Sequence, residues 1–245
     1  PTTSLTSSWE KQSVRAASSL NYTLTWAIQT SNKIAVVKVA KVINVANLIT
    51  VLRVVLALFT LALLFVPGNN DSILWLAFVL TVLVIWADGL DGYFARKLNQ
   101  TSKLGAILAI AGDRVVEMAY WITFSALNWI PVWIPLLFLV RGTFVDAMRS
   151  QAGEKGYTAF GTKTMMQSAA GKFLVASNFS RFTYAVVKAL AFCLIIAAHT
   201  KQLENTAAGP AALALVYFSA LFCIIRGLPV LLESSHLFKI DEQNT

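Results

Sequence analysis

Charged residues, histidine and cysteine are all scarce in this sequence. Only 13% of its 245 residues are charged and 57% are hydrophobic, whereas a typical soluble protein has about 25% charged residues. This composition excludes an ordinary soluble domain. The two histidines, His199 and His236, have no partner at ligand spacing, so we predict no catalytic histidine. The two cysteines lie inside apolar runs and give no ground for a disulfide or a metal cluster.

Long apolar runs fill most of the chain after residue 46. Each run is close to the roughly 20 residues that a helix needs to cross a bilayer. We therefore predict an all-α integral membrane protein, multi-pass, whose domain covers residues 47–233. Its six transmembrane helices are expected at about 47–66, 72–96, 104–127, 131–149, 182–199 and 209–232.

The ends of the chain differ from these runs. Residues 33–46 mix Val, Ile and Ala with three lysines, which predicts an interfacial amphipathic helix or simply the start of the first span. Residues 1–32 are rich in Ser and Thr and are predicted to be a poorly ordered extension. Residues 234–245 are expected to form a C-terminal tail.

The formal charge of +8 comes from basic residues that gather between the apolar runs. This distribution suits membrane lipids and phosphate-bearing substrates better than nucleic acid, which we do not expect as a partner. One set of connections carries most of the lysines, while the opposite set carries only Lys201. The positive-inside rule then predicts that both termini, and the active site in the stretch from Asp88 to Asp113, face the cytoplasm.

A polar stretch interrupts the apolar pattern between Asp88 and Asp113. Near the end of the second run, one helix face carries Asp88, Asp91, Gly92, Ala95 and Arg96. The start of the third run presents Gly105, Ala109, Gly112 and Asp113 on one face. A carboxylate in a membrane helix costs about 2.5–3.5 kcal/mol, so these aspartates need partners. Oxygen ligands on two facing helices suit Mg²⁺ that carries a phosphorylated substrate.

This stretch resembles the signature of the CDP-alcohol phosphotransferases, Asp-x2-Asp-Gly-x2-Ala-Arg-x7–8-Gly-x3-Asp-x3-Asp. Asp88, Asp91, Gly92, Ala95, Arg96, Gly105 and Asp113 match it in order. Ala109 stands where the family has its third aspartate. Three explanations are open: a substitution introduced to trap a substrate complex, a natural member with lost or altered chemistry, or a shift of the carboxylate pair to Asp113 and Glu117.

The resemblance implies a reaction and a set of roles. A phosphatidyl group would pass from CDP-diacylglycerol, or a related CDP-alcohol, to a polar alcohol, and CMP would leave. Mg²⁺ or Mn²⁺, two ions in the intact motif, would be held by Asp88, Asp91 and Asp113, with Asp113 also the catalytic base. Gly92, Ala95 and Gly105 would admit the nucleotide, and Arg96 would contact its phosphates. The resemblance also implies a homodimer. The alternative is a non-catalytic lipid-binding or scaffold subunit that retains the fold.

Ionisable and polar residues also lie inside other spans. Asn47, Thr50 and Arg53 share one face of the first span, which predicts that they point into the bundle. NLITVLR also resembles the opening span of phosphatidylglycerophosphate synthases, which implies that Asn47 and Thr50 lie near the nucleotide and Arg53 in the polar core. Snorkelling of Arg53 to the interface is the alternative. Arg114 and Glu117, three residues apart, are expected to pair.

The connection after the fourth span contains a second resemblance to the same synthases. Lys163 begins the segment KTMMQ, which is similar to their Lys-Thr-x-x-Gln. Together with Arg141 and Arg149, Lys163 could form a pocket for a phosphate on the acceptor. The best-matching acceptor is then glycerol-3-phosphate, while inositol phosphate or another polar alcohol stays open. Positive-inside topology alone would require the same charges.

Overall fold

The computed structural model of the chain describes residues 45–66, 70–97, 103–154, 156–157 and 164–233. Within this part the side chains of residues 45–46, 90–96 and 103–104 are not described. The described residues form helices and connections and contain no strand. In chain order the elements are α2 (Val45–Leu63), α3 (Asp71–Lys97), α4 (Lys103–Ala126), α5 (Trp133–Glu154), α6 (Ala169–Gly171), the π-helical turn η1 (Lys172–Ala176), α7 (Asn178–Ala198) and α8 (Ala208–Glu233).

The predicted all-helical fold is confirmed, and each of the six predicted helices is found close to its expected position. The short α6 and η1 had not been predicted. The expected extension at 1–32, nearly all of the expected interfacial helix at 33–46 and the tail at 234–245 lie outside the described residues. The division of the chain into these segments therefore stays a prediction.

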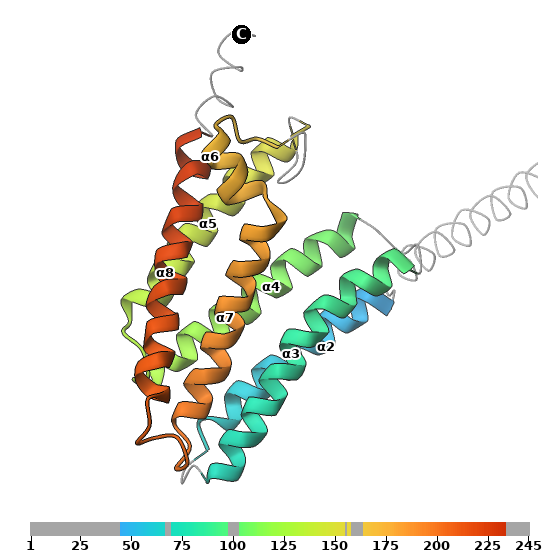
Figure 1. Cartoon of the computed structure of the whole chain (residues 1–245). Helices are drawn as coiled ribbons and strands as arrows, with labels where there is room; N and C mark the ends of the chain where they lie inside the picture. The colour runs from blue at the N-terminus through green and yellow to red at the C-terminus, as the bar shows by residue number, and fades with distance from the viewer. Residues whose placement is uncertain (1–44, 67–69, 98–102, 155, 158–163, 234–245) are drawn as a thin grey trace, which may run out of the picture.

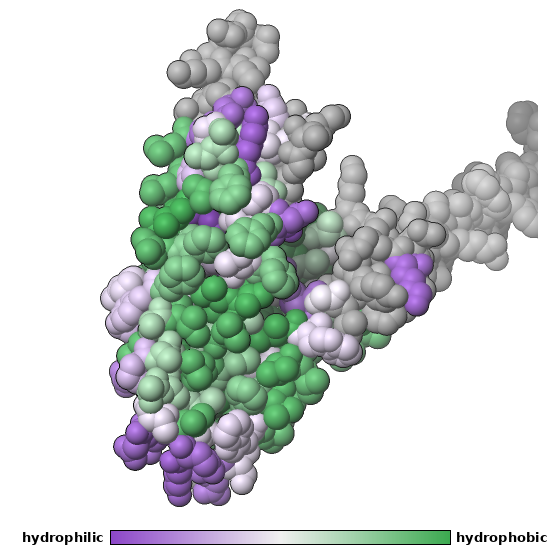
Figure 2. Space-filling view, in the orientation of Figure 1, coloured by the Kyte–Doolittle hydropathy of each residue, from purple (hydrophilic) through white to green (hydrophobic). Residues whose placement is uncertain are grey.

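Three of the described helices are long and apolar enough to cross a membrane: residues 71–89 of α3, all of α7 and all of α8. The apolar part of α2, Asn47–Leu63, is shorter, and α4 and α5 are interrupted by charged residues. Figure 2 shows hydrophobic side chains across the middle of one face and hydrophilic ones at its lower end. The chain is thus an all-α membrane protein, but helix length and apolarity alone give fewer than the six predicted spans.

The helices pack as two groups that are joined by α3 and α4. Helix α2 packs on α3 and α4, while α7 and α5 both pack on α8. Contacts of α3 with α7 and of α4 with α5 connect the groups. Figure 1 shows α2 and α3 diverging from α7 and α8 toward the upper side of the bundle. The end of α3 and the start of α4, which carry the two halves of the motif, both lie on that side.

An aromatic core fixes α4 against its neighbours. The Trp121 ring stacks on Phe138 of α5 with centroids 4.7 Å apart, and the Tyr120 ring stacks on Phe192 of α7 at 4.8 Å. The Tyr120 hydroxyl also donates a hydrogen bond of 3.0 Å to Thr81 Oγ1 on α3. Since Tyr120 lies two helix turns after the motif, this packing sets the rotation and height at which α4 presents its motif face.

A second, smaller core holds the segment that follows Lys163. Met165 and Met166 are both buried, in a cluster that also includes Val145 of α5, Val175 of η1 and Val230 of α8. The Glu233 carboxylate at the end of α8 accepts hydrogen bonds from the backbone N–H groups of Gln167 and Ser168, at 2.5 and 3.1 Å. The described part of the connection between α5 and α7 is therefore anchored to α8.

Candidate active site

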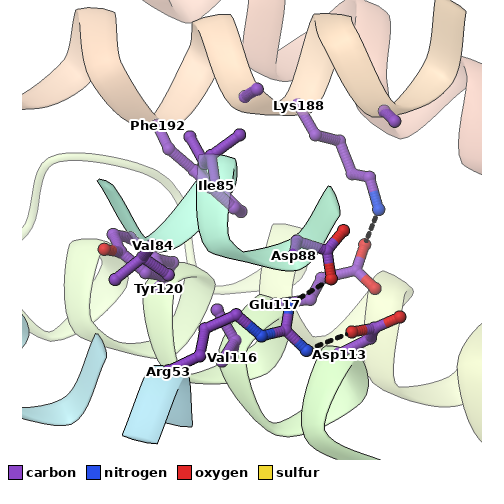
Figure 3. A pocket seen from close by; sticks show the side chains of 12 residues that line it. Arg53, Val84, Ile85, Asp88, Asp113, Val116, Glu117, Tyr120, Lys188 and Phe192 are labelled. Atoms are coloured by element: carbon purple, nitrogen blue, oxygen red, sulfur yellow. Dashed lines mark hydrogen bonds and ion pairs between the residues drawn. The ribbon is translucent and has the colours of Figure 1, made fainter. Parts of the chain in front are cut away.

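Arg53 of α2 joins the two halves of the motif. Its Nη1 donates to Asp88 Oδ1 on α3, and its Nη2 donates to Asp113 Oδ1 on α4; Figure 3 shows this bridge. Only 3% of the Arg53 side chain is exposed, which confirms its position in the polar core and rules out snorkelling. Asn47 and Thr50 are also buried, as predicted. One guanidinium thus connects three helices.

Gly112 allows α2 to approach α4 closely enough for this bridge. A Cβ atom at Gly112 would lie 2.9 Å from Thr50 Cγ2 and 3.6 Å from Arg53 Nη2. The first distance is too short for a real Cβ contact. The absence of a side chain at this position therefore lets the Arg53 guanidinium reach the aspartate that follows it in α4.

A cavity of about 260 Å³ lies beside the bridge, between α2, α3, α4 and α7. Its polar part is formed by Arg53, Asp88, Asp113, Glu117 and Lys188. Its apolar part is formed by Val84, Ile85, Val116, Tyr120, Ala185, Ala189 and Phe192. About half of each bridging aspartate side chain is exposed, 51% for Asp88 and 55% for Asp113. The cavity therefore suits a molecule with both a charged and an apolar part.

Glu117 lies one helix turn after Asp113 and belongs to a separate ion-pair network. Its predicted pairing with Arg114 is confirmed at 2.8 Å. Lys188 of α7 also donates to Glu117, at 2.6 Å, and Arg114 pairs with Asp146 of α5 at 2.8 Å. Because two cations already bind Glu117, it is poorly placed to form a new carboxylate pair with Asp113, which disfavours the third explanation for Ala109.

The sequence analysis did not identify Lys188 as a residue of this site. It lies in the middle of the apolar run of α7, and an ionisable residue in such a run is a signal for a functional or structural partner. The signal shows that Lys188 must face the bundle, but periodicity alone does not reveal that its partner is Glu117.

Three residues were predicted to bind a phosphate of the acceptor, and the structure describes two of them, Arg141 and Arg149. Arg141 and Arg149 of α5 repel each other electrostatically, and both also interact with Arg226 of α8. The Arg141 side chain runs along α8 at Gly227, where an added Cβ would lie 2.8 Å from Arg141 Cγ. Its buried Nε has no hydrogen-bond partner among the described residues. Lys163 lies outside the described residues. Three arginines therefore lie near one another, with Asp146 also near Arg149.

Arg226 lies toward the end of α8 and was not among the residues predicted for this pocket. Its Nη1 donates to Ser180 Oγ at 2.5 Å and its Nη2 to the Val175 carbonyl oxygen at 3.3 Å. It is 4% exposed. A buried arginine inside an apolar run is the same signal that Lys188 gives.

The remaining motif residues are only partly described. Asp91, Gly92, Ala95 and Arg96 belong to the helical backbone of α3, but their side chains lie outside the described part. Gly105 and Ala109 lie on α4, and Ala109 precedes Asp113 by one helix turn.

The motif implies a two-ion centre, which needs several free carboxylate oxygens. Asp88 and Asp113 are both bound by Arg53, and Ala109 offers a methyl group that cannot coordinate a metal. The described residues contain no cluster of three His, Cys, Asp or Glu side chains suited to a metal ion. By themselves, they do not fit a two-ion centre.

Comparison with known proteins shows the family of the chain. The model of the CDP-alcohol phosphatidyltransferase family matches residues 43–197, which is more than half of the chain, and the chain belongs to this family. The matched region includes Arg53, the stretch from Asp88 to Asp113 and Lys188.

The individual relatives are 24% to 33% identical to the chain over the matched residues. The chain is 24% identical over 115 residues to CDP-diacylglycerol--glycerol-3-phosphate 3-phosphatidyltransferase of Wigglesworthia glossinidia brevipalpis, covering 42% of this chain and 57% of the relative. It is 33% identical over 93 residues to cardiolipin synthase (CMP-forming) of Streptomyces coelicolor, covering 37% and 41%. A Cereibacter sphaeroides protein with the same name as the first is 32% identical over 84 residues, covering 33% and 38%. The chain therefore spans 38% to 57% of the length of these relatives.

The close approach of α2 to α4 gives a stability prediction. Gly112→Ala should lower the free energy of unfolding by about 1–3 kcal/mol, because the new methyl group collides with Thr50 Cγ2. The measurement is unfolding of the purified chain in detergent micelles. Thr50→Ser removes that Cγ2 and should recover part of the loss when it is combined with Gly112→Ala.

Gly89→Ala is the matched control, since nothing lies within 4 Å of a Cβ at this position beside Asp88. This change should be neutral or slightly stabilising, because alanine favours a helix. Equal losses for Gly112→Ala and Gly89→Ala, or no recovery with Thr50→Ser, would contradict a close α2–α4 contact at Gly112.

Proposed function

We propose that this chain is a membrane enzyme of phospholipid synthesis that transfers a phosphatidyl group from CDP-diacylglycerol to a polar alcohol and releases CMP. The observation that carries the proposal is the meeting of Asp88 and Asp113 at Arg53, beside a cavity with a polar and an apolar part. Membership of the family supports the donor class. Two of the relatives are named for glycerol-3-phosphate, which makes this alcohol our preferred acceptor.

The reaction needs a group that takes the proton of the attacking hydroxyl and positive charge near the pyrophosphate. We assign the first role to Asp113, because its carboxylate is about half exposed and lines the cavity. Positive charge would come from Arg53 and, by the family motif, from Arg96. The nucleotide would lie near Asn47 and Thr50 and over the small residues Gly92, Ala95 and Gly105.

A phosphate on the acceptor would bind at the arginine cluster. Arg141 and Arg149, with Lys163 from the neighbouring connection, were predicted for this role, and we add Arg226. The buried Arg141 Nε, which has no hydrogen-bond partner among the described residues, supports an anionic ligand there. Arg141 also lies close enough to Glu117, which lines the cavity, for their charges to attract.

The membrane arrangement belongs to the same proposal. All six long helices would cross the bilayer, with the charged residues of α4 and α5 facing the bundle interior, where they find partners. The motif and both termini would face the cytoplasm, and the chain would form a homodimer. Binding of Mg²⁺ or Mn²⁺, with Asp91 as one of the ligands, would need an aspartate at position 109, where this chain has alanine.

A second candidate is a non-catalytic lipid-binding or scaffold subunit with the same fold. The methyl group of Ala109 favours it, and so does Arg53, because its guanidinium occupies one oxygen atom of Asp88 and one of Asp113. Release of CMP distinguishes the two candidates.

Ala109→Asp should raise the rate of CMP release from CDP-diacylglycerol and glycerol-3-phosphate, assayed with Mg²⁺ in micelles, by at least about tenfold. It places a carboxylate one turn before Asp113 on the same face of α4, as the family signature has it. Ala111→Asp is the matched control: it adds the same charge to a different face of α4 and should not raise the rate. If neither the chain nor Ala109→Asp releases CMP with any alcohol, the scaffold function replaces the enzymatic one.

Arg141→Gln should raise KM for a phosphorylated acceptor by about tenfold or more. The reason is that a hydrogen bond to a charged group contributes about 1.5–3 kcal/mol. The substitution is made in the unchanged chain or in Ala109→Asp, whichever of the two releases CMP. KM for CDP-diacylglycerol should stay unchanged. Lys201→Gln, an exposed lysine in another connection, is the control and should change neither value. Equal effects of Arg141→Gln on both KM values would contradict an acceptor-phosphate pocket.

A further inference from the structure

The Arg53 guanidinium uses its two terminal nitrogens on carboxylates from two different helices. Nη1 binds Asp88 of α3 and Nη2 binds Asp113 of α4. Figure 3 shows the guanidinium at the junction of both side chains. We propose that Arg53 is the resident cation of this site and competes directly with any divalent cation for Asp88 and Asp113.

The position of Arg53 is fixed by its helix. Its side chain is only 3% exposed, and α2 is held against α4 where Thr50 packs over Gly112. Glu117, the other described carboxylate that lines the cavity, already binds Arg114 and Lys188. Asp88 and Asp113 are therefore the acidic groups of this cavity that are left to neutralise Arg53.

Charge and burial both oppose replacement of Arg53 by a metal ion. A divalent ion bound to the same oxygen atoms would lie next to the guanidinium charge, and like charges repel strongly in a medium of low dielectric constant. Withdrawal of Arg53 would leave a buried cation without its carboxylates, which is costly. With Ala109 in place of a third carboxylate, this chain has no described group that offsets either cost.

The inference depends on the proposed function only for the kind of ion expected at the site. Its test therefore measures ion binding without CDP-alcohol or acceptor, so that a lack of transferase activity leaves the result unaffected. The purified full-length chain in detergent micelles is titrated with Mn²⁺, and the electron paramagnetic resonance signal of free Mn²⁺ gives the bound fraction.

The decisive comparison is between the unchanged chain and Arg53→Gln. Arg53→Gln should bind Mn²⁺ at least tenfold more tightly, since it frees two neighbouring carboxylates. Arg53→Lys keeps the positive charge and should bind as weakly as the unchanged chain. Asp113→Asn, added to Arg53→Gln, should abolish the gain. Equal affinity of the unchanged chain and Arg53→Gln would overturn the proposal.

Thermal unfolding gives a second readout. The unfolding midpoint of the unchanged chain should be the same in Mn²⁺ and in EDTA, whereas Arg53→Gln should unfold at a lower temperature in EDTA and recover in Mn²⁺. If Arg53→Gln fails to fold, the test is Mn²⁺ binding to the unchanged chain and to Asp88→Asn. Weak Mn²⁺ binding that Asp88→Asn does not alter supports a resident arginine, and tight binding that Asp88→Asn removes contradicts it.

Discussion

Charged carboxylates in the helices of an apolar bundle are costly unless a cation lies beside them. Here that cation is the side chain of Arg53, which binds Asp88 of α3 and Asp113 of α4. The bridge depends on the missing side chain at Gly112, which lets α2 approach α4. It also forms part of the polar lining of the cavity that we assign to the substrate. The packing of α2 on its neighbours, the charges of the two aspartates and the proposed chemistry therefore all depend on the Arg53 guanidinium.

A second network supports the first without sharing its partners. Glu117 connects α4 to α7 through Lys188, and Arg114 connects α4 to α5 through Asp146. Together with the aromatic contacts of Tyr120 and Trp121, these pairs hold α4 from three sides. The motif face of α4 thus belongs to a helix that contacts α3, α5 and α7. Ala109 takes part in none of these described contacts of α4.

Much of this could be predicted from the sequence because apolar runs, helical spacing and isolated charges are local signals. The helix positions, the buried face of α2 and the Arg114–Glu117 pair follow from them. The partners of Lys188 and Arg226 could not be predicted, since a buried charge indicates that a partner exists but not which helix supplies it. Helix α6 and the π-helical turn were missed because their stretch is short and has no clear apolar period.

The most direct test of the central bridge is a double-mutant cycle on Arg53 and Asp113. The free energy of unfolding would be measured in micelles for Arg53→Met, Asp113→Asn and the combination. The bridge predicts that the double variant loses less stability than the sum of the single losses, by at least about 1 kcal/mol, because each single change already breaks the same contact. Losses that add to within about 0.5 kcal/mol would mean that the two residues do not interact, and would contradict the account.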